Sequence, residues 1–438
     1  MQSALSPPVL LAVHAGSLLA LLPIVILGRP DHALALLLLP VGWMGLMLHR
    51  RPAARKSPLS LPLGVLGLGL ALSLVATPDL RWSYPKIAGL VYGIALYFAF
   101  LEWGTSEQAW CRLALGVALA GGAVAVLALF GTAWPAKIPL LTGFIDTLPR
   151  LPWALPGAED GFHPNEVAGT LLWTVPLAWP LAFGLWAEGL RGPGRRRWGR
   201  LLGAFAFTLA AAAVPLGAML LTQSRGGWFG LVAAGGVVLT GLAPRHYRIA
   251  AGLLLAAVLV VVVFLSLEGT VLEAAADLAP DALSTGTLDF RLAVWSQALK
   301  GISDFPITGM GMNVFRQAIH VLYPTPLVDP SMNLGHAHNI FLQTALDLGL
   351  VGLVGYVALW ISALTMVWQC GRSAGIASRS ALLRLGTAGL AASLAGYGVY
   401  GMLDAVTLGA RPGFLWWGLL GLVGSLYRLQ HPDPIAQR

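Results

Sequence analysis

Residues 335–350 read GHAHNIFLQTALDLGL and place a histidine where a long polar loop meets an apolar helix. His338 comes directly before Asn339 and the apolar run that starts at Ile340. If this run spans a membrane, the imidazole of His338 lies near the depth of the lipid headgroups. Ionisable groups at membrane depth are costly, so they are candidates for a functional role. His338 is therefore the first candidate for chemistry, with simple capping of the helix as the alternative.

The composition of the chain is that of a membrane protein. Its 438 residues are 57% hydrophobic and only 11% charged, whereas average soluble domains carry about 25% charged residues. A transmembrane helix needs about 20 apolar residues, and twelve segments meet or approach this length. The sequence thus predicts an all-α polytopic membrane protein with about 12 transmembrane helices, the first of which is retained because no convincing cleavage site follows it. The segments lie near residues 8–28, 33–48, 61–77, 87–104, 109–130, 167–187, 201–222, 226–243, 249–267, 339–369, 384–404 and 412–428.

Basic residues predict how this bundle is oriented. Of the 27 Lys and Arg residues, 17 fall on the side that holds both termini, and cytoplasmic loops carry such an excess. This side is therefore predicted to be cytoplasmic, and the net charge of +8 indicates topology rather than nucleic-acid binding. Cys111 and Cys370 fall on the same side, where thiols stay reduced, so no disulfide is predicted. The 17 residues are Arg50, Arg51, Arg55, Lys56, Arg112, Arg191, Arg195, Arg196, Arg197, Arg200, Arg245, Arg248, Arg372, Arg379, Arg384, Arg428 and Arg438.

The predicted spans divide the chain into five parts. Helices one to five occupy residues 1–130, helices six to nine occupy residues 167–267, and helices ten to twelve with a short cytoplasmic tail occupy residues 339–438. External loops fill residues 131–166 and 268–338. Loops of this length usually have a function of their own, so a catalytic role is predicted for the longer one.

The longer external loop contains TLDFRLAVWSQALKGI at residues 287–302. At helical spacing, one mostly apolar face forms from Phe290, Ala293, Val294, Gln297 and Ala298. This pattern predicts an amphipathic helix that lies along the membrane or covers the end of the bundle.

Arginines on the external side suggest an anion-binding pocket. Arg225 lies in the short hairpin LTQSRGGWFG, where Gly226 and Gly227 allow close backbone approach and the polar run 222–224 favours a pocket. Arg291 lies on the amphipathic loop helix, and Arg316, Lys300 and Arg411 are weaker candidates. Guanidinium groups match phosphate oxygens in a bidentate fashion. Two arginines and a histidine therefore suit a lipid-linked phosphate or pyrophosphate, while snorkelling of the arginine side chains to the membrane surface is the alternative.

His336 and His338 form an HxH pair, but the sequence nearby offers no further ligands at metal-binding spacing, so no metal is expected. Asp347 follows His338 by about 13 Å of helix rise and cannot orient it directly. A carboxylate partner must therefore come from another element, and Asp404, near the external end of the eleventh span, is a secondary candidate for this role.

A second polar patch is predicted just before the sixth span, where residues 163–166 read HPNE. Asn165 is a secondary site candidate there. Capping of the helix by Asn165 or Glu166 is the alternative role.

Five motifs together carry a family resemblance. They are GFHPNEVAGTL at 161–171, SRGGW at 224–228, FRLAVWSQAL at 290–299, ITGMGMNVF at 307–315 and HAHNIFLQTALDLGLVG at 336–352. In this order and spacing, the chain from about residue 160 to 355 resembles the O-antigen ligase and polymerase superfamily.

The resemblance implies a membrane glycosyltransferase of the GT-C type, without a nucleotide sugar, a cofactor or a metal. Its ligases transfer O-antigen polysaccharide from undecaprenyl pyrophosphate to lipid A-core, at the periplasmic face of the Gram-negative inner membrane. By resemblance, His338 corresponds to the family's essential histidine, and Arg225 and Arg291 correspond to the arginines that engage the pyrophosphate.

Three alternative functions stay open. An O-antigen polymerase and an O-linked oligosaccharyltransferase use the same donor and differ in the acceptor. A twelve-helix transporter belongs to another class, and it would place charged or broken helices at the bilayer midplane. The polar candidates here gather at one face instead, which favours chemistry at the membrane surface.

Overall fold

The computed structural model describes residues 57–431 except 136, 150–160, 192–194, 243–248, 251, 254–256, 258–287, 326–327, 330–331 and 374–378. Of the first 56 residues it describes 16–18, 20–24, 32 and 35. The predicted spans near 8–28, 33–48 and 249–267 therefore lie largely outside the described residues. The same holds for the first part of the long external loop.

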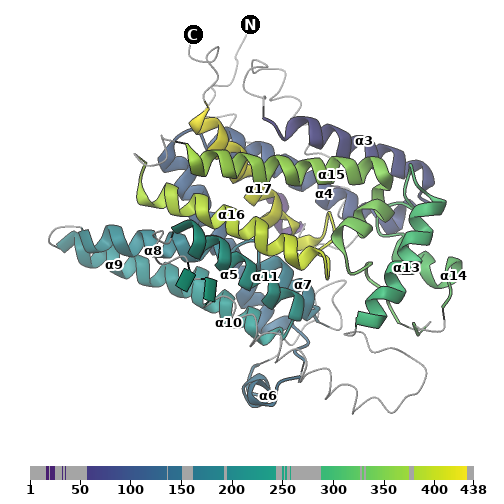
Figure 1. Ribbon diagram of the computed structural model, residues 1–438, viewed down its shortest axis with the longest axis horizontal. Coiled ribbons are helices and arrows are strands. Elements are labelled where there is room, and N and C mark those ends of the chain that lie inside the picture. Colours follow the sequence, from purple (N-terminus) through teal and green to yellow (C-terminus); the bar gives the residue numbers. More distant parts are fainter. Residues whose placement is uncertain are drawn as a thin grey trace, which may run out of the picture.

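The described chain is helical, apart from one isolated parallel bridge between Thr132 and Phe162 (Figure 1). The α-helices are α3 (Ser60–Ala76), α4 (Leu80–Trp103), α5 (Glu107–Gly131), α6 (Pro139–Ile145), α7 (Pro164–Leu171), α8 (Val175–Arg191), α9 (Arg195–Phe207), α10 (Val214–Leu221), α11 (Arg225–Leu242), α13 (Leu288–Asp304), α14 (Phe315–Leu322), α15 (Ile340–Arg372), α16 (Ala381–Gly401) and α17 (Phe414–Gln430). A π-helical turn, η3 (Thr208–Ala213), joins α9 to α10, and a 3-10 turn, η6 (Arg411–Gly413), precedes α17. The all-α prediction is confirmed for these residues.

Four of the described helices are long and apolar enough to cross a membrane, or five if the bent pair α7–α8 is one span. The four are Leu80–Trp103, Glu107–Gly131, Arg196–Leu221 and Ile340–Arg372. These helices mark a multi-pass membrane protein. The full layout of twelve spans and the GT-C architecture stay predictions.

Two of the predicted spans differ from the observed helices for local reasons. The span predicted at 87–104 begins seven residues earlier, because Asp79 accepts a hydrogen bond from the backbone of Arg81 and caps α4. The span predicted at 167–187 is broken between α7 and α8, which are bent by 41°. Pro176 lies in the first turn of α8, where its missing N–H is tolerated.

The helices pack in pairs through small residues and a central group of aromatic rings. The pair α3–α15 and the pair α11–α16 make the most extensive contacts. A Cβ added at Gly69 of α3 would lie 2.5 Å from Cα of Gly352, so only glycine permits this close approach between the backbones. Trp173, Trp360, Tyr397 and Trp416 stack together in the core, with the ring centroids of Trp360 and Trp416 5.0 Å apart.

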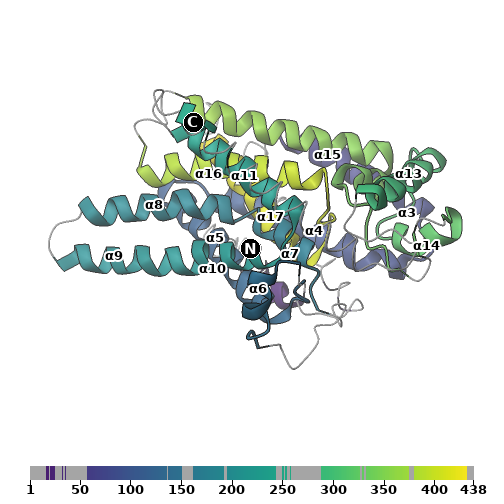
Figure 2. The same cartoon turned by 60° about the horizontal axis from the view of Figure 1, so that its bottom comes forward.

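The bundle has two chemically different ends. Figures 1 and 2 show α13 and α14 at one end and the last turns of α8 with the first turns of α9 at the other. At the second end, Glu107 accepts hydrogen bonds from the backbone of Ser380 and from Arg379, and Arg428 donates to the carbonyl of Leu101. Basic residues predicted to be cytoplasmic thus share one end, opposite α13.

The amphipathic helix predicted in the long loop is confirmed as α13. The side chains predicted for its apolar face are all buried: Phe290, Ala293, Val294, Gln297 and Ala298. They pack in a small separate core with α14 and the first turns of α15, where Met310 and Leu346 also lie. The helix therefore covers the start of α15, where His338 lies.

The long helix α15 is broken at Gly349, which has a φ of 68°. The turn before α14 fits into this break, since Met310 donates to the carbonyl of Leu346 and Leu350 donates to that of Pro306, both at 2.7 Å. A Cβ at Gly349 would lie 2.1 Å from the carbonyl oxygen of Ile307. The break therefore fixes residues 306–310 onto the first segment of α15.

Gly349→Ala is expected to destabilise the protein by at least about 1–3 kcal/mol, the cost of one residue held in a disfavoured backbone conformation. The steric conflict with Ile307 adds to this cost. Gly371→Ala is the matched control, because this glycine lies in the same helix and a Cβ there meets nothing within 4 Å. Unfolding of both variants in detergent measures the difference, and equal stability would contradict the assigned role of the break.

Candidate active site

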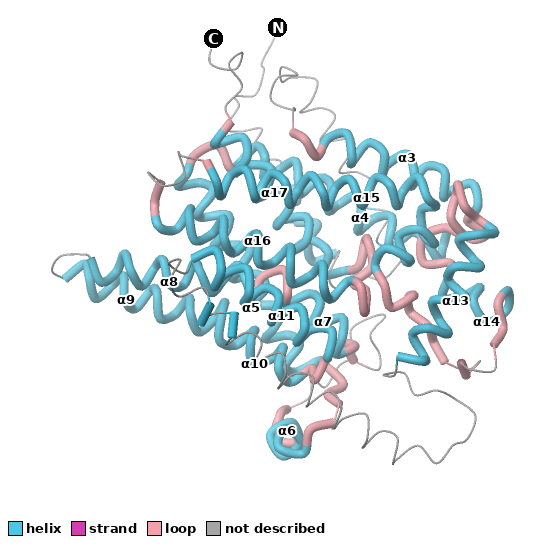
Figure 3. Tube along the Cα trace, in the orientation of Figure 1, coloured by secondary structure: helices cyan, strands magenta, loops and turns pink. Residues whose placement is uncertain are grey.

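The loop that carries the two histidines is held at the start of α15. Asn339 caps the helix, since its Oδ1 accepts from the backbone N–H groups of Phe341 and Leu342. Its Nδ2 donates to the carbonyl of Met402 at 3.1 Å, so the loop before α15 is fixed to the loop after α16 (Figure 3). Asn339 is therefore the residue that caps α15, and the side chain of His338 is available for another role.

His338 has a φ of 48°, in the left-handed region that residues other than glycine rarely adopt. Such backbone strain persists where the surroundings impose it, and it concentrates at functional sites. Here Gln343 accepts from the backbone N–H of Ala337 at 2.8 Å and donates to Asp347 at 2.9 Å. Asp347 therefore supports the histidine loop through Gln343, which is a structural task.

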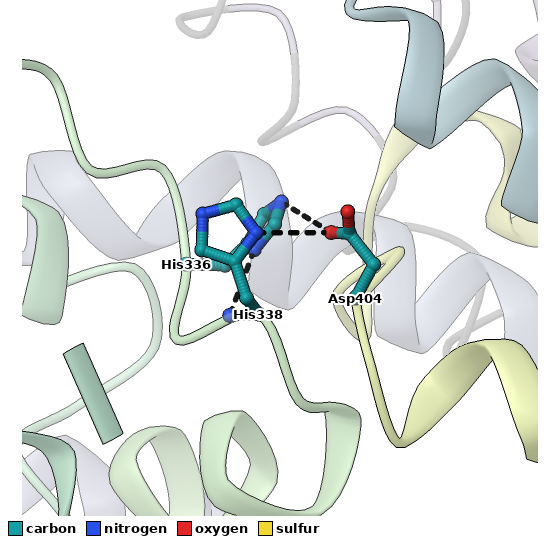
Figure 4. A group of neighbouring side chains, drawn as sticks. All are labelled: His336, His338 and Asp404. Carbon is teal, nitrogen blue, oxygen red and sulfur yellow. Dashed lines mark hydrogen bonds and ion pairs between the residues drawn. The ribbon is translucent and has the colours of Figure 1, made fainter. Parts of the chain in front are cut away.

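Asp404 is the carboxylate beside His338, as Figure 4 shows. Its Oδ1 lies 3.4 Å from Nδ1 of His338, and its side chain is only 2% exposed. Nδ1 of His338 and Oδ2 of Asp404 are buried without a hydrogen-bond partner among the described residues. Burial alone would raise the pKa of Asp404, but the two histidines, His338 foremost, bring it below its usual range. The carboxylate is therefore charged, and its charge favours the His338 tautomer with the proton on Nδ1, the nitrogen that lies 3.4 Å away.

His336 is the second neighbour of Asp404. Its Nε2 lies 3.5 Å from Oδ1 of Asp404 and 4.0 Å from the carboxylate of Glu166. Burial and the adjacent His338 lower the pKa of His336 to about 3, although Asp404 opposes this shift. His336 is consequently neutral at physiological pH, and its ring packs edge-on against that of His338 with centroids 4.6 Å apart.

His336, His338 and Asp404 each offer one potential metal-ligand atom, and these atoms lie within 4.8 Å of one another. The fold therefore supplies the carboxylate that the local sequence does not. However, the backbone N–H of His338 donates to Nδ1 of His336 at 3.2 Å, which places the ring proton of His336 on Nε2. A protonated nitrogen cannot bind a metal, so while this hydrogen bond is in place only two ligands remain, fewer than zinc sites use.

Stability is expected to fall between pH 7 and pH 5 because of His336. Below its usual pKa of 6.5 the unfolded chain takes up a proton that the folded protein, with a pKa of about 3, does not. The free energy of unfolding then decreases by up to about 1.4 kcal/mol per pH unit. His336→Asn keeps an acceptor for the N–H of His338 and removes the titrating group. Thermal unfolding of this variant should show a weaker pH dependence than wild type, and an identical dependence would contradict a neutral, buried His336.

Arg291 lies next to the histidines on α13. The ring of its neighbour Phe290 packs edge-on against His338, with centroids 5.7 Å apart. Burial lowers the pKa of the Arg291 guanidinium; the negative charge of Asp404 raises it, and the positive charge of Arg225 lowers it further. Arg291, Asp404 and Arg225 are therefore electrostatic neighbours. Nε of Arg291 is buried without a hydrogen-bond partner among the described residues. Both arginines predicted from the sequence thus come to the same site as His338.

Arg225 is the first residue of α11, in the tight connection after α10. A Cβ at Gly227 would lie 2.7 Å from that of Ala168, so this glycine brings α11 close to α7, as predicted. The side chains of the polar run beside Arg225 make hydrogen bonds within the fold, and the pocket that the run favours stays a prediction. Ser224 caps the helix by accepting from Gly227, and Gln223 binds Ile138 and Pro135 in the shorter external loop.

The HPNE patch reaches the site through Glu166 and His163. Asn165 contributes its backbone carbonyl, which accepts from the hydroxyl of Tyr400 at 2.7 Å. Neither Asn165 nor Glu166 occupies the cap position, which His163 holds. Glu166 instead approaches His336, and His163 is among the charges that act on the His336 ring.

Lys86 is a site residue that the sequence analysis missed. It lies in α4, donates to the hydroxyl of Thr407, and is within electrostatic reach of Glu166, Arg316 and Arg411. The available signal was a lysine one residue before the predicted apolar span, at its external end. Lys300, by contrast, is exposed on α13.

Comparison with known proteins agrees with these motifs. The family model described as O-Antigen ligase matches residues 195–357, which include Arg225, Arg291 and His338. Asp404 and the HPNE patch lie outside the matched range. No curated protein matches the chain. The chain therefore carries an O-antigen ligase domain at residues 195–357.

Proposed function

We propose that the protein is an O-antigen ligase. It transfers O-antigen polysaccharide from undecaprenyl pyrophosphate to lipid A-core at the periplasmic face of the Gram-negative inner membrane. The observation that carries the proposal is the contact between the buried Asp404 and His338, with two arginines beside it. This arrangement supplies a base and a holder for an anionic leaving group, which is what transfer from a pyrophosphate carrier requires.

His338 acts as the general base. Asp404 holds the proton of His338 on Nδ1, so Nε2 carries the lone pair that accepts a proton from the acceptor hydroxyl. As that hydroxyl oxygen bonds to the anomeric carbon of the donor, the bond from this carbon to the pyrophosphate oxygen breaks. The electron pair leaves with undecaprenyl pyrophosphate, whose negative charge Arg225 and Arg291 stabilise. Glu166 faces His336, at 4.0 Å from its Nε2.

Direct displacement inverts the anomeric configuration. A retaining mechanism needs a carboxylate that attacks the anomeric carbon, but Asp404 is buried against the two histidines. The linkage in the product should therefore have the opposite anomeric configuration to that in the donor. Comparing the two linkages by NMR tests this step.

A polymerase and an O-linked oligosaccharyltransferase share the donor, and a transporter moves a substrate without joining it to another. Purified protein in liposomes, supplied with the lipid-linked donor, separates these functions. The ligase proposal expects polysaccharide on lipid A-core only when this acceptor is present. Longer chains on the donor lipid would indicate a polymerase, polysaccharide on a protein acceptor an oligosaccharyltransferase, and movement of intact donor across the bilayer a transporter.

Removal of divalent metal ions is expected to leave the transfer rate unchanged. The proton on Nε2 of His336 faces Asp404, and Asp404 is needed to orient His338, so a metal would compete with the base for the same atoms. Transfer is measured after treatment with EDTA and again after adding back zinc or magnesium. Loss of activity with EDTA that either metal restores would show that the three side chains hold an ion instead.

A further inference from the structure

A second group of cationic side chains lies near the histidines, on different elements from the arginines assigned to the donor. Arg225 and Arg291 belong to α11 and α13, whereas Lys86 belongs to α4 and Arg316 to α14. Lys86 acts on the charge of His336, which places it close to the reacting groups. Among the charges that act on Lys86, Glu166 is the strongest, followed by Arg316, Asp347 and Arg411.

The fold brings these cations together through fixed contacts. The hydroxyl of Ser83 donates to the backbone carbonyl of Met312 at 2.7 Å, and the side-chain amide of Asn313 donates to the backbone carbonyl of Trp82. The first turns of α4 therefore lie against the residues just before α14. Lys86 itself donates to Thr407, in the loop that leads to Arg411. The cluster is therefore built from three segments that are far apart in the sequence.

Arg316 lies against the histidine loop. A Cβ at Gly335 would be 2.8 Å from a terminal nitrogen of its guanidinium, so the glycine leaves room for the arginine beside His336. Nε of Arg316 is buried without a hydrogen-bond partner among the described residues. The guanidinium is half-buried, and its buried Nε–H group lacks an acceptor among the described residues. An anion would supply this acceptor through a charge-assisted hydrogen bond.

Among the described residues, the two carboxylates near Lys86 also contact other groups. Glu166 and Asp347 are within reach of Lys86, but Asp347 already accepts from the backbone of Asn313 and from Gln343, and Glu166 faces His336. Neither carboxylate pairs with Arg316, whose guanidinium makes no ion pair among the described residues. Like charges held together at the end of a membrane bundle repel one another unless an anion joins them.

We propose that Lys86 and Arg316, together with Arg411, bind a phosphate group on the acceptor glycolipid. This inference rests on the proposed function, in which Arg225 and Arg291 hold the pyrophosphate of the donor. In a direct displacement the attacking hydroxyl and the leaving group lie on opposite faces of the anomeric carbon. The anions of donor and acceptor therefore need separate groups of cations, and the cluster around Lys86 supplies the second.

The test compares acceptors that differ only in phosphate. Transfer by wild type, Lys86→Met and Arg316→Met is measured with lipid A-core and with the same acceptor after enzymatic removal of its phosphates. Each variant should raise the KM for the phosphorylated acceptor by about 10- to 100-fold, the effect of losing a charge-assisted hydrogen bond. The KM for the donor should stay unchanged, and the KM for the dephosphorylated acceptor should be the same in the variants as in wild type.

Two controls make the result specific. Lys300→Met removes an exposed lysine of α13 and should change neither KM. Lys86→Arg keeps the charge and should restore most of the affinity for the phosphorylated acceptor, which a purely structural role of Lys86 would not predict. An increase in the KM for the donor, or an equal loss with dephosphorylated acceptor, would overturn the inference while leaving the ligase proposal in place.

If wild type transfers nothing to lipid A-core, the proposed function fails, and binding still tests the cation cluster. Quenching of tryptophan fluorescence then reports the affinity of wild type and Lys86→Met for the two forms of lipid A-core. Tighter binding of the phosphorylated form by wild type but not by Lys86→Met is the expected result. Equal binding of both forms by wild type would refute the second anion site.

Discussion

Replacing Arg291 by Gln is expected to lower the transfer rate by about 10²- to 10³-fold, as found for other groups that stabilise charge developing in a transition state. Arg291 is partly buried, its chain neighbour Phe290 packs against the ring of His338, and Arg225 and Asp404 are its electrostatic neighbours. Gln keeps much of the length of the side chain and removes the charge. Because both arginines serve the same leaving group, Arg225→Gln should have a similar effect, and the double variant should lose less than the product of the two.

The rate is measured at saturating donor and acceptor, so that a loss of binding alone does not account for it. Lys300→Gln on the same helix is the matched control, because this lysine is exposed and should leave the rate unchanged. If Arg291→Gln raised only the KM for the donor and left the maximal rate intact, the arginine would bind the substrate without stabilising the departing charge.

Asp404→Asn is expected to lower the rate by about 10²- to 10⁴-fold, the full contribution of a general base. The amide nitrogen of Asn can donate to Nδ1 of His338, which would move the ring proton to Nε2 and leave no lone pair for the acceptor hydroxyl. The effect therefore comes from the wrong tautomer, since the side chain keeps its shape.

Protein folding is controlled by measuring unfolding in detergent beside the transfer rate. Asp404→Asn that unfolds as wild type does but transfers slowly would support the role in orientation. A variant with normal transfer would show that His338 does not need this carboxylate, and that Nε2 is not selected as proposed.

The sequence predicted those parts of the fold and the site that follow from local patterns. Burial of Phe290, Val294 and Ala298 on α13 follows from the helical spacing of apolar residues in one short segment. Asp404 was a candidate because it lies at the external end of a predicted span, and the external ends of antiparallel helices meet in one layer. The first prediction needs only the helical spacing of apolar residues, and the second needs only the side of the membrane that is predicted for each loop.

Other parts depend on contacts between distant segments. In the sequence, Gly349 is one of several glycines in an apolar run, and nothing nearby predicts that α15 breaks there. The break depends on the turn from Pro306 to Met310, which packs into it. Nothing in the sequence indicates that the side-chain amide of Gln223 holds the shorter external loop. Lys86 was missed because its importance comes from Arg316 and Arg411, which other segments supply.

The most direct test of the account is transfer of polysaccharide from an undecaprenyl pyrophosphate donor to lipid A-core by purified wild type and by His338→Ala, at equal amounts of folded protein. Wild type should form the linked product, and the variant should form it slower by about 10²-fold or more, because the base is lost. Transfer by His338→Ala at close to the wild-type rate would contradict a mechanism built on this histidine.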